Sequence, residues 1–206
     1  MNTSDNRSWA FVGPLTVALW IAGLALLTSH QPGDHATGSE ILAWYEAHTN
    51  TIVVGGWLFM IGCLGFVTFV AGVGRRLAAP VLALAGAAIA GVAGMLTAAV
   101  DVTGGIDKND IGPATAAAFH HAMDIFFITA ELGAVLPLAV VAVVAWRTRV
   151  LPRWWAAFSG LVALVLLIGP IGWLGLIFGL PIWTLGTSLF VLIGSRSRVR
   201  AAAATA

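Results

Sequence analysis

Charged side chains are scarce in this sequence. Asp, Glu, Lys and Arg make up 9% of the 206 residues, and 59% of the chain is hydrophobic, whereas a soluble globular domain carries about 25% charged residues. So few charges cannot cover a surface that faces water, which excludes a soluble domain of useful size. We therefore expect lipid to surround most of the chain.

Cysteine is almost absent as well. The one cysteine, Cys63, lies inside an apolar stretch, which excludes an intramolecular disulfide and a zinc cluster built from cysteines. The sequence has no stripe of basic residues, so it does not indicate nucleic-acid binding. Tryptophan, in contrast, is frequent at nine residues, as expected for a protein anchored at two lipid–water interfaces.

Long apolar stretches, separated by short polar connections, fill the sequence. The first four are each about 20 residues or longer, enough to cross a hydrocarbon core of about 30 Å at about 1.5 Å per helical residue. The last apolar region, 154–195, is too long for one span and suits two helices joined by a turn, at 169–172 or at 178–181, where Gly and Pro cluster. The predicted spans are about 9–28, 51–73, 78–100, 125–145, 154–174 and 178–195.

Basic residues predict the orientation. With the N-terminus inside the cell, six crossings place every Lys and Arg except Lys108 on the cytoplasmic side, as the positive-inside rule favours. Five crossings would place the C-terminal arginines outside, so an even number is preferred. We expect the first span to be retained, because its apolar run exceeds the usual length of about 7–15 residues in a cleaved signal peptide. The basic residues are Arg7, Arg75, Arg76, Lys108, Arg147, Arg149, Arg153, Arg196, Arg198 and Arg200.

These features predict an all-α fold. We expect a single integral membrane domain over 1–206, a polytopic transmembrane bundle of six helices in the plasma membrane with both termini in the cytoplasm. On the outer side, Ser39 can cap a short helix that carries Ile41 and Tyr45 on one side. We interpret the segment of about 39–49 as an amphipathic helix lying at the outer interface.

Small residues predict where the helices pack. Lipid provides no hydrophobic drive for helices to associate, so close backbone approach and polar contacts must hold them together. We expect the second and third spans to form a tight antiparallel hairpin, with a glycine face that packs within one chain or joins two subunits. These residues are Gly55, Gly62, Gly65 and Gly72 in the second span, and Ala83, Ala87 and Gly91 in the third.

Polar side chains are concentrated at the start of the fourth predicted span. His120, Asp124 and Glu131 fall at i, i+4 and i+11 on one stripe of a helix, and His121 lies beside it. We expect Glu131 inside the outer half of the hydrocarbon, where an acid tends to face the bundle interior or a water-filled cavity. Asp101, at the outer end of the third span, is its expected acidic neighbour.

Two chemical functions suit these residues. In one, His120, His121 and Asp124 bind a divalent metal ion, since imidazole and carboxylate groups are suitable ligands, and a metal-dependent hydrolase is a special case. In the other, Asp101, Asp124 and Glu131 form the path of a small proton- or cation-coupled transporter, since buried acids serve as proton relays. Further metal ligands are expected on the same side, from Asp101, Glu46, His48, His30 or His35. A haem would be held by His48 together with His120 or His121.

A third interpretation gives these side chains structural roles. Interfacial His and Asp then cap the exposed turn of the fourth span, and Glu131 forms a hydrogen bond to a neighbouring helix. The protein would be a non-enzymatic membrane accessory or scaffold component, and its partners would be the lipid bilayer and either a second copy of the chain or another membrane protein. We prefer this interpretation, because the sequence lacks a metal-binding motif such as HExxH.

Five short motifs extend over nearly the whole chain. They are Trp9-Ala10-Phe11-Val12-Gly13-Pro14, Gly38-Ser39-Glu40-Ile41-Leu42-Ala43-Trp44-Tyr45, Asp124-Ile125-Phe126-Phe127, Leu151-Pro152-Arg153-Trp154 and Leu180-Pro181-Ile182-Trp183. With these motifs the sequence resembles a family of small multi-pass integral membrane proteins of high-GC actinobacteria. That family has no assigned activity, so the resemblance implies an architecture and an acid at Asp124 but no mechanism. The pair His120-His121 departs from the family's pattern and so does not support a shared metal function.

Overall fold

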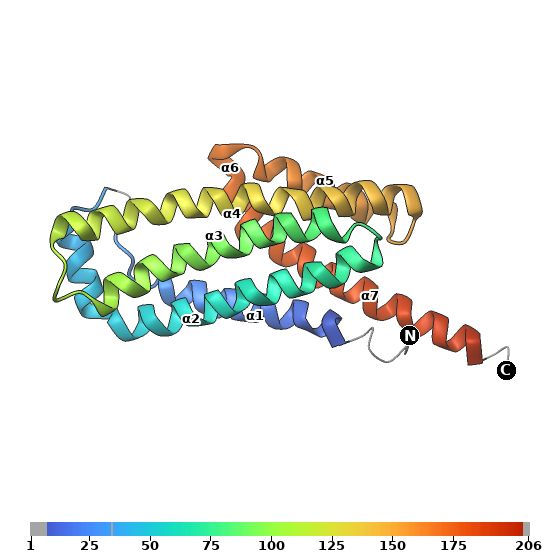
Figure 1. Cartoon of the computed structure of the whole chain (residues 1–206), viewed down its shortest axis with the longest axis horizontal. Coiled ribbons are helices and arrows are strands. Elements are labelled where there is room, and N and C mark those ends of the chain that lie inside the picture. The colour runs from blue at the N-terminus through green and yellow to red at the C-terminus, as the bar shows by residue number, and fades with distance from the viewer. Residues whose placement is uncertain (1–7, 34, 204–206) are drawn as a thin grey trace.

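The structure is a computed structural model that describes residues 8–33 and 35–203, and Arg7 lies outside this part. Over these residues it is helical, without a strand, and the first four helices lie side by side in an antiparallel bundle (Figure 1). The elements are α1 (Ser8–Leu27), α2 (Gly38–Arg76), α3 (Pro80–Ile106), α4 (Pro113–Thr148), α5 (Arg153–Leu166), α6 (Gly169–Leu174), the π-helix η1 (Gly175–Gly179) and α7 (Leu180–Ala203).

Five stretches of the described chain are long and apolar enough to cross a membrane. Large apolar side chains are exposed along all of them, for example Phe11, Val81 and Ile125. In water such a surface would promote aggregation, whereas in a bilayer it is the surface that lipid tails contact. The five stretches are Ala10–Leu27, Gly38–Arg76, Pro80–Ile106, Pro113–Thr148 and Gly169–Ile193.

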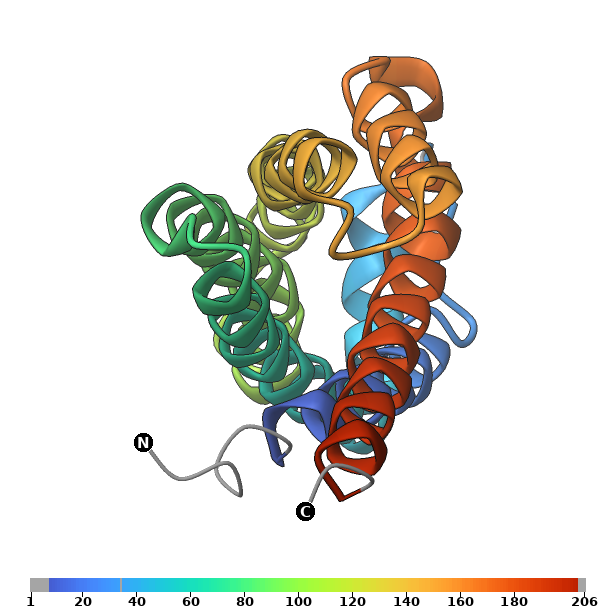
Figure 2. The ribbon, with the colours of Figure 1, turned by 90° about the vertical axis from the view of Figure 1, so that its right-hand side faces the viewer.

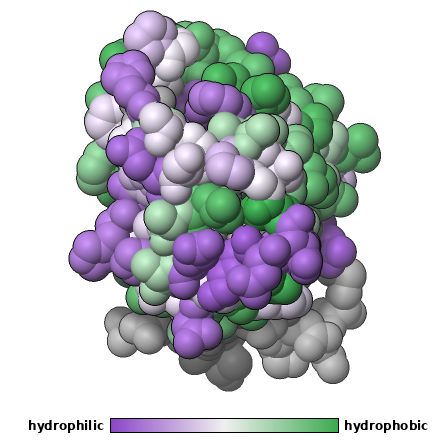
Figure 3. All heavy atoms as spheres, turned by 90° about the vertical axis from the view of Figure 1, so that its left-hand side faces the viewer, coloured by the Kyte–Doolittle hydropathy of each residue, from purple (hydrophilic) through white to green (hydrophobic). Residues whose placement is uncertain are grey.

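The two ends of the bundle differ in charge. One end, here called the loop end, carries the α1–α2 and α3–α4 connections and Lys108, and its surface is rich in hydrophilic residues (Figure 3). The opposite end, here called the arginine end, carries the α2–α3 and α4–α5 connections, the start of α1 and the end of α7 (Figure 1). Arg153 lies there with its guanidinium 5.8 Å from the centre of the Trp146 ring, an aromatic–arginine contact suited to a lipid–water interface.

The predicted outer helix is the first part of α2. A capping box begins it: the Thr37 N–H donates to Glu40 Oε2 at 2.7 Å, and the Glu40 N–H donates to Thr37 Oγ1 at 3.3 Å. The backbone then kinks at His48, with φ −122° and ψ 16°. The apolar side of this segment differs from the expectation, because Ile41 and Tyr45 are buried in a cluster with α1, α3 and α4 and do not face lipid.

The last two spans were predicted at 154–174 and 178–195, and the structure places the boundary between them elsewhere. Helix α5 ends at Leu166 and α6 begins at Gly169, so the chain turns at 167–168. Pro170 lies in the first turn of α6, where a missing N–H costs nothing. At the second Gly- and Pro-containing cluster, 178–181, the chain does not reverse direction. The wide π-helix η1 precedes Pro181, and the helix continues into α7.

Helix α5 is consequently short. Its 14 residues extend over about 21 Å, and the α5–α6 turn lies only part of the way along α4 (Figure 1). The exposed side chains at this turn are apolar, including Leu167 and Ile168. The chain therefore leaves the arginine end in α5 and returns to it in α7 without reaching the loop end.

Small residues bring the helices together, but in a different pairing from the one predicted. The glycine face of α2 packs against α1: Gly55 lies against Leu26, and Gly62 lies against Trp20. The α2–α3 hairpin is tight as expected, yet it uses another side of α2, where Val67 meets Gly91 of α3. The glycine face is thus occupied within one chain.

Buried polar side chains attach α7 to α5. The Trp183 indole N–H donates to Ser159 Oγ at 3.0 Å, and the Trp155 indole N–H donates to Thr187 Oγ1 at 3.0 Å. Ser159 itself donates to the carbonyl oxygen of Trp155 at 2.8 Å. Hydrogen bonds of this kind join helices in a medium where polar groups have few other partners.

Candidate functional site

A buried hydrogen bond joins α2 and α3 near the loop end. The Tyr45 hydroxyl donates to Asp101 Oδ1 at 3.1 Å, and both residues are buried. Asp101 is one of the predicted site residues, but its partner is a tyrosine and not a second acid. This hydrogen bond connects α2 to α3 and gives the buried carboxyl group a donor.

Lys108 forms a second connection at the same end. Its ammonium group donates to Thr49 Oγ1 at 2.8 Å and to the carbonyl oxygen of Glu46 at 3.4 Å. These bonds attach the α3–α4 connection to α2 on either side of the kink at His48. Lys108 is therefore held by α2 and does not project freely from the surface.

Histidines of the loop end form a pair. His30, from the α1–α2 connection, stacks on His48 at the kink of α2, with ring centroids 5.2 Å apart and an interplanar angle of 14°. His48 Nδ1 also lies 3.2 Å from the carbonyl oxygen of Trp44. His35 is exposed in the same connection. Sequence spacing alone gave no reason to pair His30 with His48.

The predicted polar stripe on α4 is divided between two environments. His120 and Glu131 are buried, whereas His121 and Asp124 are exposed. Successive residues on a helix point in directions about 100° apart, so one histidine can be buried while the next is exposed. The His120 and His121 rings lie 6.4 Å apart with an interplanar angle of 56°. His120 Nδ1 is buried without a hydrogen-bond partner.

The proposed metal ligands do not converge. Within residues 8–33 and 35–203, no three His, Cys, Asp or Glu side chains are placed to hold a metal ion. A site made by His120, His121 and Asp124 would need the exposed and the buried side of α4 to meet at one point. Metal binding by these residues stays a prediction without a preformed geometry.

The predicted acidic path is also spread out. Gly133 of α4 packs against Ala90 of α3, which places Glu131 and Asp101 roughly 13 Å apart along the bundle. The Glu131 carboxylate instead faces Gly172 of α6, where a Cβ atom would lie 2.6 Å from Oε2. The structure therefore brings Glu131 against α6 and Asp101 against Tyr45, and does not bring the two acids together.

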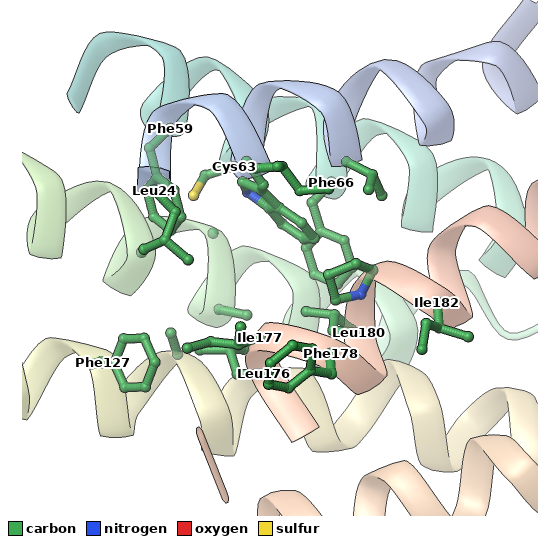
Figure 4. A pocket seen from close by; sticks show the side chains of 18 of the residues that line it. Leu24, Phe59, Cys63, Phe66, Phe127, Leu176, Ile177, Phe178, Leu180 and Ile182 are labelled. Atoms are coloured by element: carbon green, nitrogen blue, oxygen red, sulfur yellow. The ribbon is translucent and has the colours of Figure 1, made fainter. Parts of the chain in front are cut away.

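An apolar cavity of about 560 Å³ opens on the side of the bundle (Figure 4). Residues of α1, α2, α3, α4, η1 and α7 line it, and nearly all of their side chains are aliphatic or aromatic, among them Trp20, Phe59, Phe127 and Phe178. The cavity was missed in the sequence analysis, because its walls come from segments whose pairing only the fold defines. The cluster at 178–181, where a breaker lies within an apolar stretch, was a local signal near it, but it did not indicate a cavity.

Comparisons with protein-family models, with curated proteins and with solved structures find no match for this chain. The resemblance to a family of actinobacterial membrane proteins stays a prediction. The function must therefore be argued from the arrangement of the residues.

Proposed function

We propose that the chain is a multi-pass protein of the plasma membrane with its arginine end in the cytoplasm, and that it is a non-enzymatic accessory or scaffold component. Helices α1 to α4 then cross the bilayer, and α5 to α7 enter from the cytoplasmic side and return to it. Both described ends of the chain lie at the arginine end, which faces the viewer in Figure 2 (Figures 1 and 2). The positive-inside rule favours this orientation, because Arg75, Arg147 and Arg153 lie at that end and Lys108 lies at the other.

The use of polar groups at the loop end supports the accessory role. Asp101 accepts a hydrogen bond from Tyr45, and Lys108 donates to α2, so each of these groups connects helices. An enzyme or a carrier needs several such groups to face one opening. The predicted metal ligands instead lie on separate sides of α4, and the predicted relay residues Asp101 and Glu131 lie on different helices at separate depths.

The test is to isolate the tagged chain from cells treated with a membrane-permeable crosslinker. We expect a discrete complex that holds a second copy or another membrane protein in a constant ratio, because a scaffold acts through its partners. His121→Ala and Glu131→Gln should leave that ratio unchanged, and elemental analysis should find far less than one metal ion per chain.

Two results would contradict this proposal. Near-stoichiometric metal that is lost in His121→Ala would favour the metal-binding alternative. Proton flux in proteoliposomes that is lost in Glu131→Gln would favour the transporter alternative.

A further inference from the structure

The side cavity has an exposed rim and a buried back wall. Its rim is formed by α1 on one side and by η1 and α7 on the other, where Ile21, Phe178 and Ile182 are 61%, 56% and 54% exposed. Its back wall includes Cys63 and Phe66 of α2, which are 3% and 1% exposed. The cavity therefore leads from the apolar outer surface of the bundle into its interior.

The position of the rim determines what can enter. Ile21 lies within the apolar stretch Ala10–Leu27, and Ile182 lies within the apolar stretch Gly169–Ile193, and both lie inside the bilayer in the placement proposed above. At these depths the surrounding medium is hydrocarbon and contains almost no water. The material that meets this opening is thus the tail region of the bilayer lipids.

We propose that this cavity binds a single hydrocarbon chain of a membrane lipid, which enters sideways between α1 and the η1–α7 segment. This inference rests on the membrane placement proposed above, and it adds a ligand site that the accessory role does not require. The volume of about 560 Å³ lies within the range of about 300–1,000 Å³ that is typical of small-molecule sites.

The lining explains why the bound part is a hydrocarbon and not a polar headgroup. Thr28, at the rim, donates its hydroxyl to the carbonyl oxygen of Leu24 at 2.9 Å, so it offers no free donor. The Trp20 indole N–H is buried without a hydrogen-bond partner, and this single donor cannot match the several polar and charged atoms of a headgroup. No charged side chain lines the cavity within the described part of the chain.

Packing provides the driving force. Moving a chain from lipid into an apolar cavity gains no hydrophobic free energy, since both media are apolar. An empty cavity, however, deprives its walls of dispersion contacts, and filling it restores them. The π-helical turn of η1 supplies Leu176, Ile177 and Phe178 to the lining, and such turns are frequent where helices form binding sites.

The experiment uses the full chain reconstituted in phosphatidylcholine–phosphatidylglycerol vesicles that contain a small fraction of phosphatidylcholine with a diazirine in the middle of one acyl chain. After irradiation, the labelled residues are identified by mass spectrometry. We expect adducts on lipid-facing residues such as Leu64, and also on the buried pair Cys63 and Phe66, which lipid outside the cavity cannot touch.

Variants of the rim separate cavity binding from general contact with lipid. Ala25 is exposed and lines the rim, so Ala25→Trp should obstruct the opening and lower labelling of Cys63 and Phe66 about tenfold, equivalent to about 1.4 kcal/mol. Ile182→Trp obstructs the opposite rim and should act in the same direction. Ala22→Trp is the matched control, because Ala22 is exposed on the same helix but does not line the cavity.

The outcomes distinguish failure of this inference from failure of the proposed function. Labelling of Leu64 without any labelling of Cys63 and Phe66 would overturn the lipid site while leaving the membrane placement intact. Back-wall labelling that both rim variants leave unchanged, or that Ala22→Trp lowers equally, would also overturn it. Absence of labelling at Leu64 would contradict the membrane placement itself.

Discussion

Replacing Trp183 with alanine should lower the free energy of unfolding by about 3–5 kcal/mol, as for other buried tryptophans replaced by alanine. Trp183 is completely buried in α7. Its ring meets Phe69 of α2 edge-on, with centroids 6.1 Å apart at 82°, and its N–H donates to Ser159 of α5. Three elements therefore lose contacts at once, and α7 should separate from the bundle first.

Two further variants divide this effect into its parts. Trp183→Phe keeps an aromatic ring and removes the N–H, so it should cost about 0.6–1.7 kcal/mol, the range of hydrogen bonds between membrane helices. Trp57→Ala removes an exposed ring of α2 and should change stability little. The measurement is unfolding in micelles titrated with a denaturing detergent. Equal losses in Trp183→Ala and Trp57→Ala would contradict the packing of α7 described above.

Adding one methyl group at Gly133 should destabilise the bundle by about 1–3 kcal/mol, the usual cost of overpacking. A Cβ atom at this position would lie 2.5 Å from the backbone nitrogen of Ala90. Backbone atoms cannot rotate away as a flexible side chain can, so α3 and α4 would have to move apart. Gly86 of α3 is equally close to α4. A Cβ atom added at Gly86 would lie 2.8 Å from the carbonyl oxygen of Gly133.

Gly160→Ala is the control for Gly133→Ala, with the opposite expected sign. A Cβ atom at Gly160 would lie 3.6 Å from the Cβ atom of Ala142, an ordinary van der Waals distance. Alanine should therefore stabilise α5 by about 0.5–1 kcal/mol, because it restricts the unfolded chain more than glycine does. Thermal unfolding in detergent measures both variants. A stable Gly133→Ala protein would show that α3 and α4 are not in close contact.

Much of the helical architecture was predictable from the sequence. Apolar length predicted where the first four long helices lie, because the bilayer core sets how many residues a crossing needs. Helices α2 and α4, however, begin well before the predicted spans 51–73 and 125–145. Pro170 and Pro181 look alike in the sequence, yet one begins a helix and the other follows a π-helical turn. Whether the chain reverses at such a proline depends on its contacts with neighbouring helices, and local composition does not predict these contacts.

Pairing of side chains was less predictable. The glycine face of α2 was visible as a pattern, but Gly62 meets Trp20 of α1 and not α3, and spacing alone does not say which neighbour a face selects. Asp101 was predicted as a candidate site acid, whereas its donor Tyr45 lies 56 residues earlier, on the other side of the α2–α3 connection. The side cavity was missed for the same reason, since its walls meet only in the folded bundle.

Cysteine accessibility in intact cells tests the central claim most directly, namely that the arginine end of a membrane-spanning bundle faces the cytoplasm. In a Cys63→Ser background, Asp110→Cys and Thr148→Cys place single thiols at exposed positions of the loop end and the arginine end. A membrane-impermeant maleimide should label the first in intact cells and the second only after permeabilisation. Labelling of Thr148→Cys in intact cells, with Asp110→Cys protected, would contradict the account.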